Sequence, residues 1–232
     1  MRSVTRAAID AFTALAQAPS VAAFAPIRRA THCAYAGGSV IWGARPFDTD
    51  ASLAANLDGF AADLTVFVDA AGELRLDAFV IELPAAHGTT LDRLAQTTHA
   101  LLRGLAARDP RAEGALDGEV DEPAWCYAFG GDPLFVNTFA PCYPSEHSRY
   151  GFGVAATFLL LQPRHSFARV VRRGETVLPV AARHRIRSDY AAHARGYDHA
   201  ISAAPFEARR IVRPLLAGDP PVRWWDAPAE LP

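Results

Sequence analysis

Apolar side chains spaced three or four residues apart predict two long helices in the first half of the chain. One begins near Asp50, a suitable N-cap, and continues to about residue 67. The other begins at Thr89 or Thr90 and ends at about residue 107. Their apolar positions are Leu53, Leu57, Phe60, Leu64 and Phe67 in the first helix, and Leu91, Leu94, Leu101, Leu102 and Leu105 in the second. A weaker amphipathic stripe over residues 2–17 predicts an N-terminal helix.

Shorter apolar runs, bounded by turn-forming residues, predict the strands. Residues 31–36 and 39–43 are short extended candidates on either side of Gly37-Gly38. The connection Gly130-Gly131-Asp132-Pro133 is typical of a hairpin. The longer strand candidates are residues 74–83, 124–129, 134–139 and 155–162, and further helices are expected at 165–173 and 183–195. Residues 108–123 and the proline-rich tail are expected to be irregular.

This order of elements predicts the fold class. Helices precede a group of strands whose short connections make neighbours hairpin partners. We therefore expect an α+β fold, a single domain over residues 1–232, with a central, mainly antiparallel sheet flanked by helices. Neither GxGxxG nor GxxxxGK[ST] occurs in the sequence, so nothing in it favours a nucleotide-binding fold.

Composition narrows the classes of partner. The 232 residues carry a formal net charge of −2, which gives no reason to expect nucleic acid. No apolar run approaches the ~20 residues that cross a bilayer. Asp10 interrupts the apolar N-terminal region, which indicates an amphipathic helix in place of a signal peptide. We expect a cytoplasmic protein with no nucleic-acid or membrane partner. All basic residues are arginine, so a lysine Schiff base is excluded.

The three cysteines, Cys33, Cys126 and Cys142, predict neither a zinc site nor a disulfide framework. They form no CxxC pair, and their number is odd. The default interpretation of each is a small buried hydrophobic residue. Cys142 is the exception to consider, because it lies between two prolines outside any apolar run.

The segment APCYPSEHSR, residues 140–149, carries the most distinctive chemistry. Pro141 and Pro144 restrict the backbone, so we expect a stiff, extended loop in which His147 and Arg149 point the same way. A thiol or imidazole beside a fixed cation suits an iron porphyrin, whose iron needs an axial ligand and whose propionates need a partner. His147 and Cys142 both remain candidates for that ligand. The alternative is a structural loop histidine bonded to the backbone.

The chain also resembles the YqcI/YcgG family, whose characterised members are haem-dependent N-oxygenases. The resemblance lies in HCAYAGG (32–38), SLAANLDGFAADL (52–64), LDAFVIEL (76–83), LLRGLAARDP (101–110) and the runs 129–153 and 158–167. Ser148-Arg149 matches the end of a family motif His-Pro-x-x-Ser-Arg, and Gln162-Pro163 begins a match to Gln/Asn-Pro-x-x-x-Phe. The family histidine falls at Tyr143 or Pro144, so His147 is out of register.

The resemblance implies a haem b cofactor, with O₂ or peroxide as oxidant and an external electron donor. The implied reaction hydroxylates a nitrogen of a small amino-acid-like substrate, such as a guanidino group, in natural-product biosynthesis. The expected iron ligand is His147 or Cys142, with Cys33 as a third candidate. The other expected roles are cofactor contacts for Arg149, Tyr143 and Gln162, a distal polar group for Asn137 and a substrate carboxylate for Glu146. We expect aromatic side chains near this loop to line a dry pocket, namely Phe135, Phe139, Tyr143, Tyr150, Phe152 and Phe158.

Two other classes of function stay open at this point. One is a haem-binding sensor or carrier without turnover. The other is a haem-free small-molecule-binding module whose loop has only a structural role. The substrate, the electron donor and the choice between monomer and homodimer are not determined by the sequence.

Overall fold

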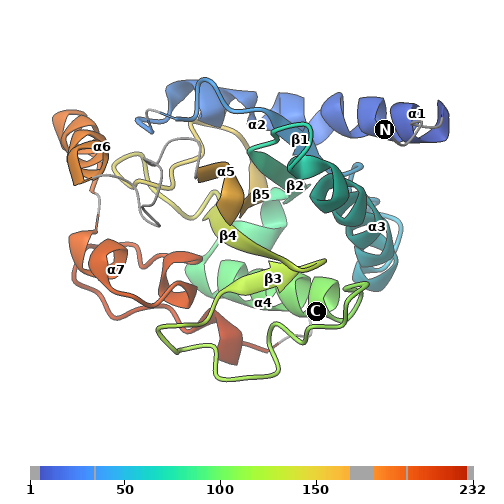
Figure 1. Ribbon diagram of the computed structural model, residues 1–232. Helices are drawn as coiled ribbons and strands as arrows, with labels where there is room; N and C mark the ends of the chain where they lie inside the picture. Colours follow the sequence, from blue (N-terminus) through green and yellow to red (C-terminus); the bar gives the residue numbers. More distant parts are fainter. Residues whose placement is uncertain (1–5, 34, 168–179, 197, 229–232) are drawn as a thin grey trace.

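The computed structural model describes residues 6–33, 35–167, 180–196 and 198–228, and its centre is a five-stranded sheet (Figure 1). The strand order is β1-β2-β5-β4-β3. β1 runs parallel to β2, and the other neighbouring pairs are antiparallel. The strands are β1 (Ile41–Gly43), β2 (Ala78–Pro84), β3 (Tyr127–Phe129), β4 (Asp132–Phe139) and β5 (Ala156–Pro163). The predicted α+β fold with a mainly antiparallel sheet is confirmed.

Helices surround this sheet. Figure 1 shows α1 and α2 along the top, α3 at the right, and α6 and α7 at the left. The α-helices are α1 (Arg6–Ala16), α2 (Pro19–Ala30), α3 (Leu53–Ala71), α4 (Leu91–Ala106), α5 (Arg164–Phe167), α6 (Val180–Ala192) and α7 (His199–Ala203). Short 3₁₀ helices are η1 (Ala85–Gly88), η2 (Ala208–Arg210) and η3 (Trp224–Asp226). No helix in the described part of the chain is long and apolar enough to cross a membrane.

The two predicted long helices form with their own capping residues. Ser52 caps α3, since its hydroxyl accepts a hydrogen bond from the N–H of Ala55, so the start lies two residues beyond the predicted Asp50. Thr90 caps α4 by accepting from the N–H of Arg93, as predicted. Both helices pack on the main face of the sheet, where their leucines bury against alternate strand residues such as Phe79.

Strand alternation produces a second, smaller core on the opposite face. Val80 on β2 and Leu160 on β5 point to this second face, and α2 covers it with Phe24 and Ile27. The C-terminal segment packs on the main face instead. There the Thr138 hydroxyl donates to the carbonyl of Ile211 at 2.7 Å. The C-terminal segment thus covers the main face, whereas α2 covers the second face.

Before β1 the structure differs from the prediction, since one helix was not predicted and the strand predicted at 31–36 was wrong. Residues 19–30 form α2, which the sequence pattern did not predict, although Pro26 lies inside the helix. Burial of Phe24 and Ile27 over the second face outweighs the hydrogen bond that this proline cannot make. The predicted strand at 31–36 is a loop with turns, described except for residue 34. The helix predicted at 165–173 is described only as far as Phe167, and residues 168–173 lie outside the described residues.

Candidate functional site

The segment formed by residues 140–149 is a succession of turns. The N–H of Tyr143 donates to the carbonyl of Ala140 at 3.1 Å, and the N–H of His147 donates to that of Pro144 at 2.9 Å. Pro141 takes the second position of the first turn, where its fixed φ is favourable. The expectation of an extended loop with His147 and Arg149 on one face was therefore wrong. The prolines are accommodated by turns as readily as by extended backbone.

Both ring nitrogens of His147 are used within the fold. Nδ1 accepts a hydrogen bond from the N–H of Arg149 at 3.0 Å, so it carries no proton. Nε2 is then the protonated nitrogen and donates to the carbonyl of Pro214 at 3.1 Å. The ring also stacks on Tyr143, with ring centroids 4.3 Å apart. In this arrangement the imidazole has no lone pair left for a metal, which fits the structural alternative for His147.

Burial keeps this imidazole neutral. It lowers the pKa of His147 to about 4, helped by the charge of Arg149 and opposed by the bond to Pro214. The Tyr143 hydroxyl donates to the carbonyl of Arg213 at 3.2 Å and accepts from its N–H at 3.0 Å. Burial raises the pKa of Tyr143 to about 12. Tyr143 and His147 thus attach the loop to the C-terminal segment, and we assign both a positioning role.

The other two loop residues singled out by the sequence have opposite environments. Cys142 is half-buried against the main core, and burial raises the pKa of its thiol to about 11. That environment favours a neutral thiol over the thiolate that binds iron. Glu146 is exposed, and its carboxylate accepts a hydrogen bond from the Ser145 hydroxyl at 2.7 Å. This bond lowers the pKa of Glu146, which is therefore ionised at neutral pH.

The second face of the sheet brings together residues that are distant in the sequence. Asn137 on β4 donates through Nδ2 to Oε1 of Gln162 on β5, at 2.9 Å. Phe139 lies two residues along β4 on the same face, and the guanidinium carbon of Arg149 lies 5.5 Å from its ring centroid. Three of the predicted site residues therefore belong to one surface.

Cys33 lies at the end of α2, next to this surface. Burial raises the pKa of its thiol, whereas the backbone N–H groups of Tyr35 and Ala36 and the charge of Arg149 act in the opposite direction. The N–H of Ala36 donates to the carbonyl of Cys33 at 3.0 Å, so this N–H lies close to the thiol, and a nearby positive charge stabilises a thiolate. Burial thus favours the neutral thiol at Cys33 as it does at Cys142, and Cys33 differs in having the charge of Arg149 nearby, which favours the thiolate.

The six aromatic side chains expected around one pocket divide among separate clusters. Phe139 and Phe158 pack edge-on against Phe24 of α2. Tyr150 and Phe152 lie under the guanidinium of Arg195, which is 4.0 Å from the Phe152 ring centroid. Phe135 contacts Phe167, with ring centroids 5.9 Å apart, and Tyr143 stacks on His147. Phe152 also packs against the second core together with Phe139 and Phe158, whereas Tyr143 belongs to the main core, so the six side chains do not form one aromatic wall.

One cavity adjoins the 140–149 segment and the residues that follow α6. It measures about 370 Å³ and is lined by Glu146, His147 and Ser148, by Asp198 ahead of α7, and by residues 213–217. The sequence analysis did not identify Ser148 or Asp198 as lining residues. Asp198 carried one local signal, an aspartate at the N-cap of a short helix, whereas nothing near Ser148 in the sequence indicated the C-terminal wall.

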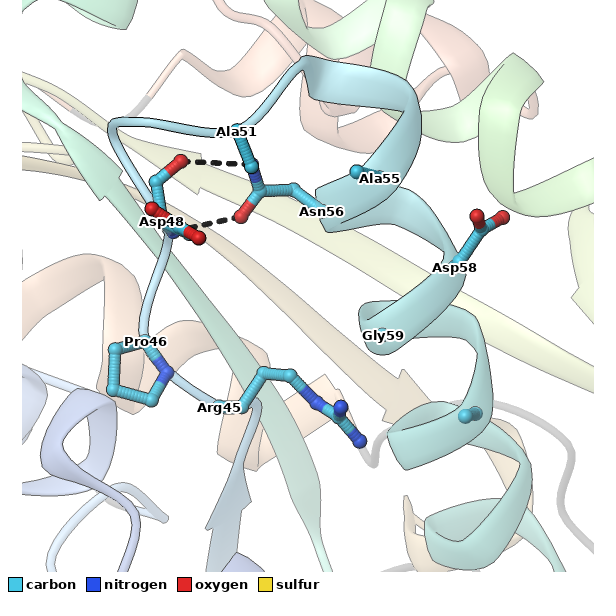
Figure 2. A pocket seen from close by; sticks show the side chains of 9 residues that line it. Arg45, Pro46, Asp48, Ala51, Ala55, Asn56, Asp58 and Gly59 are labelled. Carbon is cyan, nitrogen blue, oxygen red and sulfur yellow. Dashed lines mark hydrogen bonds between the residues drawn. The ribbon is translucent and has the colours of Figure 1, made fainter.

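A second cavity, of about 470 Å³, lies beside α3 (Figure 2). Its polar side chains are engaged with other protein groups. Arg45 forms an ion pair with Asp63 at 2.6 Å, and Asn56 both donates to and accepts from the backbone of Asp48. Asp58 pairs with the side chain of Arg108. None of the predicted site residues lines this cavity.

Comparison with known families agrees with the resemblance. A family model for the YqcI/YcgG family matches residues 33–200, most of the chain. The chain belongs to the YqcI/YcgG family. The match begins at Cys33 and contains every predicted site residue, whereas Arg213 and Pro214, the partners of Tyr143 and His147, lie outside it. No curated protein and no solved structure gives a significant match.

The described side chains offer no conventional metal-binding cluster. Within the described ranges, no three His, Cys, Asp or Glu side chains form a group that could hold a metal ion. A haem differs from such a site because its porphyrin supplies four nitrogens and the protein supplies one or two axial ligands. In this member of the YqcI/YcgG family, haem binding therefore requires only that one of Cys33, Cys142 and His147 can bind the iron.

Proposed function

We propose that this protein is a haem-dependent N-oxygenase in which Cys33 is the axial ligand. The observation that carries the proposal is the position of Cys33 beside the charge of Arg149 and the backbone N–H groups of Tyr35 and Ala36, which lower the pKa of a thiol that burial raises. Iron deprotonates a coordinating thiol, and these neighbours then offset the cost of the buried negative charge. His147 is left out of the ligand set because both its ring nitrogens are engaged.

A thiolate-bound haem supplies oxygen activation, since the sulfur donates electron density that favours O–O cleavage. One oxygen atom is transferred to the substrate nitrogen, giving R–NHOH from R–NH₂. With O₂, the second atom leaves as water after an external donor supplies two electrons and two protons. With hydrogen peroxide the second atom also leaves as water, and no electron donor is needed.

The protein's own contribution is a partly dry surface with a few directed polar groups. Phe24, Phe139 and Phe158 pack edge-on and exclude water from part of the second face. After the bond between Asn137 and Gln162, the amide oxygen of Asn137 and three amide N–H groups remain, and none of them has a hydrogen-bond partner among the described residues. These groups would orient a small substrate that both donates and accepts hydrogen bonds.

Arg149 links the two parts of this proposed site. Its guanidinium lies over Phe139, and its charge favours the Cys33 thiolate. It also donates to the carbonyl of Arg210 at 3.3 Å, which holds the side chain between the sheet and the C-terminal segment. We propose that it stabilises the ligand sulfur directly. The propionate contact expected from the resemblance stays a prediction.

Titration of the purified chain with haem, followed by an assay for product, tests the proposal. We expect a Soret band that saturates at one haem per chain. With hydrogen peroxide and L-arginine, mass spectrometry is expected to detect a product heavier by one oxygen atom. A saturating Soret band without turnover of a panel of amines and guanidines would favour the sensor or carrier. A protein that binds no haem would favour the small-molecule-binding module and exclude the N-oxygenase.

A further inference from the structure

Arg28, in the last turn of α2, is bonded to the segment that follows Cys33. We infer that Arg28 is a positioning residue for Cys33 and holds the backbone that presents the thiol to haem iron. The inference rests on the proposed function, because it takes Cys33 as the axial ligand. It adds to this ligand a supporting side chain that acts through backbone hydrogen bonds.

The guanidinium of Arg28 donates two hydrogen bonds to carbonyls beyond its own helix. Nε donates to the carbonyl of Ala36 at 3.2 Å, and Nη2 donates to that of Gly37 at 3.0 Å. A basic side chain in the last turn of a helix commonly bonds to the final carbonyls of that helix. Here the side chain instead reaches carbonyls eight and nine residues further along the chain. Arg28 therefore connects the end of α2 to the segment formed by residues 35–39.

The 35–39 segment in turn determines where the backbone of Cys33 lies. The N–H of Ala36 donates to the carbonyl of Cys33 at 3.0 Å. Besides the bond from Arg28, the carbonyl of Ala36 accepts bonds from the hydroxyl and the N–H of Ser39, at 2.7 and 3.2 Å. These bonds all meet at Ala36. A displacement of Ala36 would therefore also displace the N–H groups of Tyr35 and Ala36, which favour the thiolate of Cys33.

Hydrogen bonds, more than packing, hold the 35–39 segment in place. A side-chain carbon added at Gly37 or Gly38 would meet no atom within 4 Å, so the space beside both glycines is open. Directly after the segment, the N–H of Val40 donates to Oδ2 of Asp77 at 2.7 Å, which ties the chain to the start of β2. Within the described part of the chain, Arg28 is the side chain outside the segment that bonds to it. Its loss would leave the segment attached only at its two ends.

The shape of the guanidinium explains this role better than its charge does. Nε and Nη2 lie in one rigid plane, so a single arginine can fix two neighbouring carbonyls. A lysine keeps the charge but presents one ammonium group on a flexible chain. Arg149 differs, because it acts on the Cys33 thiol through its charge. Arg28→Lys is therefore expected to loosen the 35–39 segment without removing a positive charge.

Amide hydrogen exchange of the haem-free full-length chain tests the first step of the inference. In Arg28→Lys we expect the N–H groups of Ala36 and Ser39 to exchange at least about tenfold faster than in the natural protein, as the loss of a hydrogen bond from a charged group implies. The matched control is Arg29→Lys, at the exposed neighbouring position, which should leave this exchange unchanged. Unchanged exchange in Arg28→Lys would overturn the inference, whether or not the protein binds haem.

Haem titration of the same variants separates positioning of the ligand from a general structural role. With all variants folded by circular dichroism, we expect the haem dissociation constant of Arg28→Lys to rise about tenfold, and the Soret band that reports thiolate ligation to weaken. Arg29→Lys should match the natural protein in both measurements. If Arg28→Lys exchanges faster but keeps the natural haem affinity and Soret band, the inference alone is overturned. A natural protein that binds no haem would overturn the proposed function and, with it, this inference.

Discussion

The 140–149 segment contacts two groups of polar side chains, which differ in how far the fold itself uses their atoms. On the C-terminal side, the polar atoms of the His147 and Tyr143 side chains form hydrogen bonds with the backbone of Arg149, Arg213 and Pro214. On the side of the second face, backbone N–H groups and the charge of Arg149 act on the sulfur of Cys33, whose thiol burial otherwise keeps neutral. The difference shows that the type of a side chain alone does not determine whether it can bind a metal. The side chain must also have a lone pair that no hydrogen bond within the fold occupies.

This contrast explains which features could be predicted from the sequence. The helix α4, its cap Thr90 and the hairpin of β3 and β4 were predictable, because each depends on residues close together in the chain. The pairing of Asn137 with Gln162 followed only in part, since both were singled out but their contact requires the register of β4 against β5.

The role of His147 was not predictable from local sequence. Its acceptor, Pro214, lies 67 residues further along the chain, in a tail that was expected to be irregular and packed onto the body, with no partner predicted for it. The helix α2 was missed for a related reason, because the burial of Phe24 against β-strand residues depends on tertiary packing. Long-range contacts thus explain why α2 was not predicted and why His147 was wrongly considered as an iron ligand.

The largest expected effect concerns the folding role of His147. His147→Ala leaves the buried carbonyl of Pro214 and the N–H of Arg149 without partners. We expect the free energy of unfolding to fall by about 3 kcal/mol, from two unsatisfied groups and the lost ring packing. Urea denaturation at neutral pH measures it. A loss below about 0.5 kcal/mol, the size of an ordinary surface substitution, would show that His147 does not hold the loop.

The second prediction uses the titration of the same ring. The pKa of His147 is about 4 in the folded protein and 6.5 ordinarily, so the folded state disfavours the protonated form. This stabilisation is complete above about pH 6.5 and is lost as the pH falls toward 4, by at most about 3 kcal/mol. Urea denaturation at pH 7.5 and 4.5 should show a steeper loss for the natural protein than for His147→Gln. Equal slopes would contradict the assignment.

A smaller effect is expected for Tyr143→Phe. The substitution keeps the ring stacked on His147 but removes the hydroxyl that bonds both backbone groups of Arg213. We expect about 1–2 kcal/mol lower stability, since the backbone groups lose a partner. Differential scanning calorimetry measures the change, and Tyr150→Phe, on the outer part of the loop, serves as the control. An equal effect in both variants would argue against the anchoring role.

The smallest effect concerns Arg149 and the sulfur of Cys33. The charge of Arg149 lowers the pKa of this thiol, although burial keeps it raised overall. Arg149→Gln should therefore move the pH profile of thiol alkylation further upward. The measurement uses a background in which Cys126 and Cys142 are replaced by serine. If the pH profile of alkylation does not move, or moves downward, Arg149 does not stabilise the proposed Cys33 thiolate.

The absorption spectrum of the reduced, carbon monoxide-bound, haem-loaded protein tests the central claim most directly. Thiolate ligation shifts the Soret band of this complex to a distinctly longer wavelength than imidazole ligation does. The account predicts the long-wavelength band in the natural protein and in His147→Gln, and its loss in Cys33→Ser, with Cys126→Ser as the matched control. A long-wavelength band that persists in Cys33→Ser, or an imidazole-type band that disappears only in His147→Gln, would contradict it.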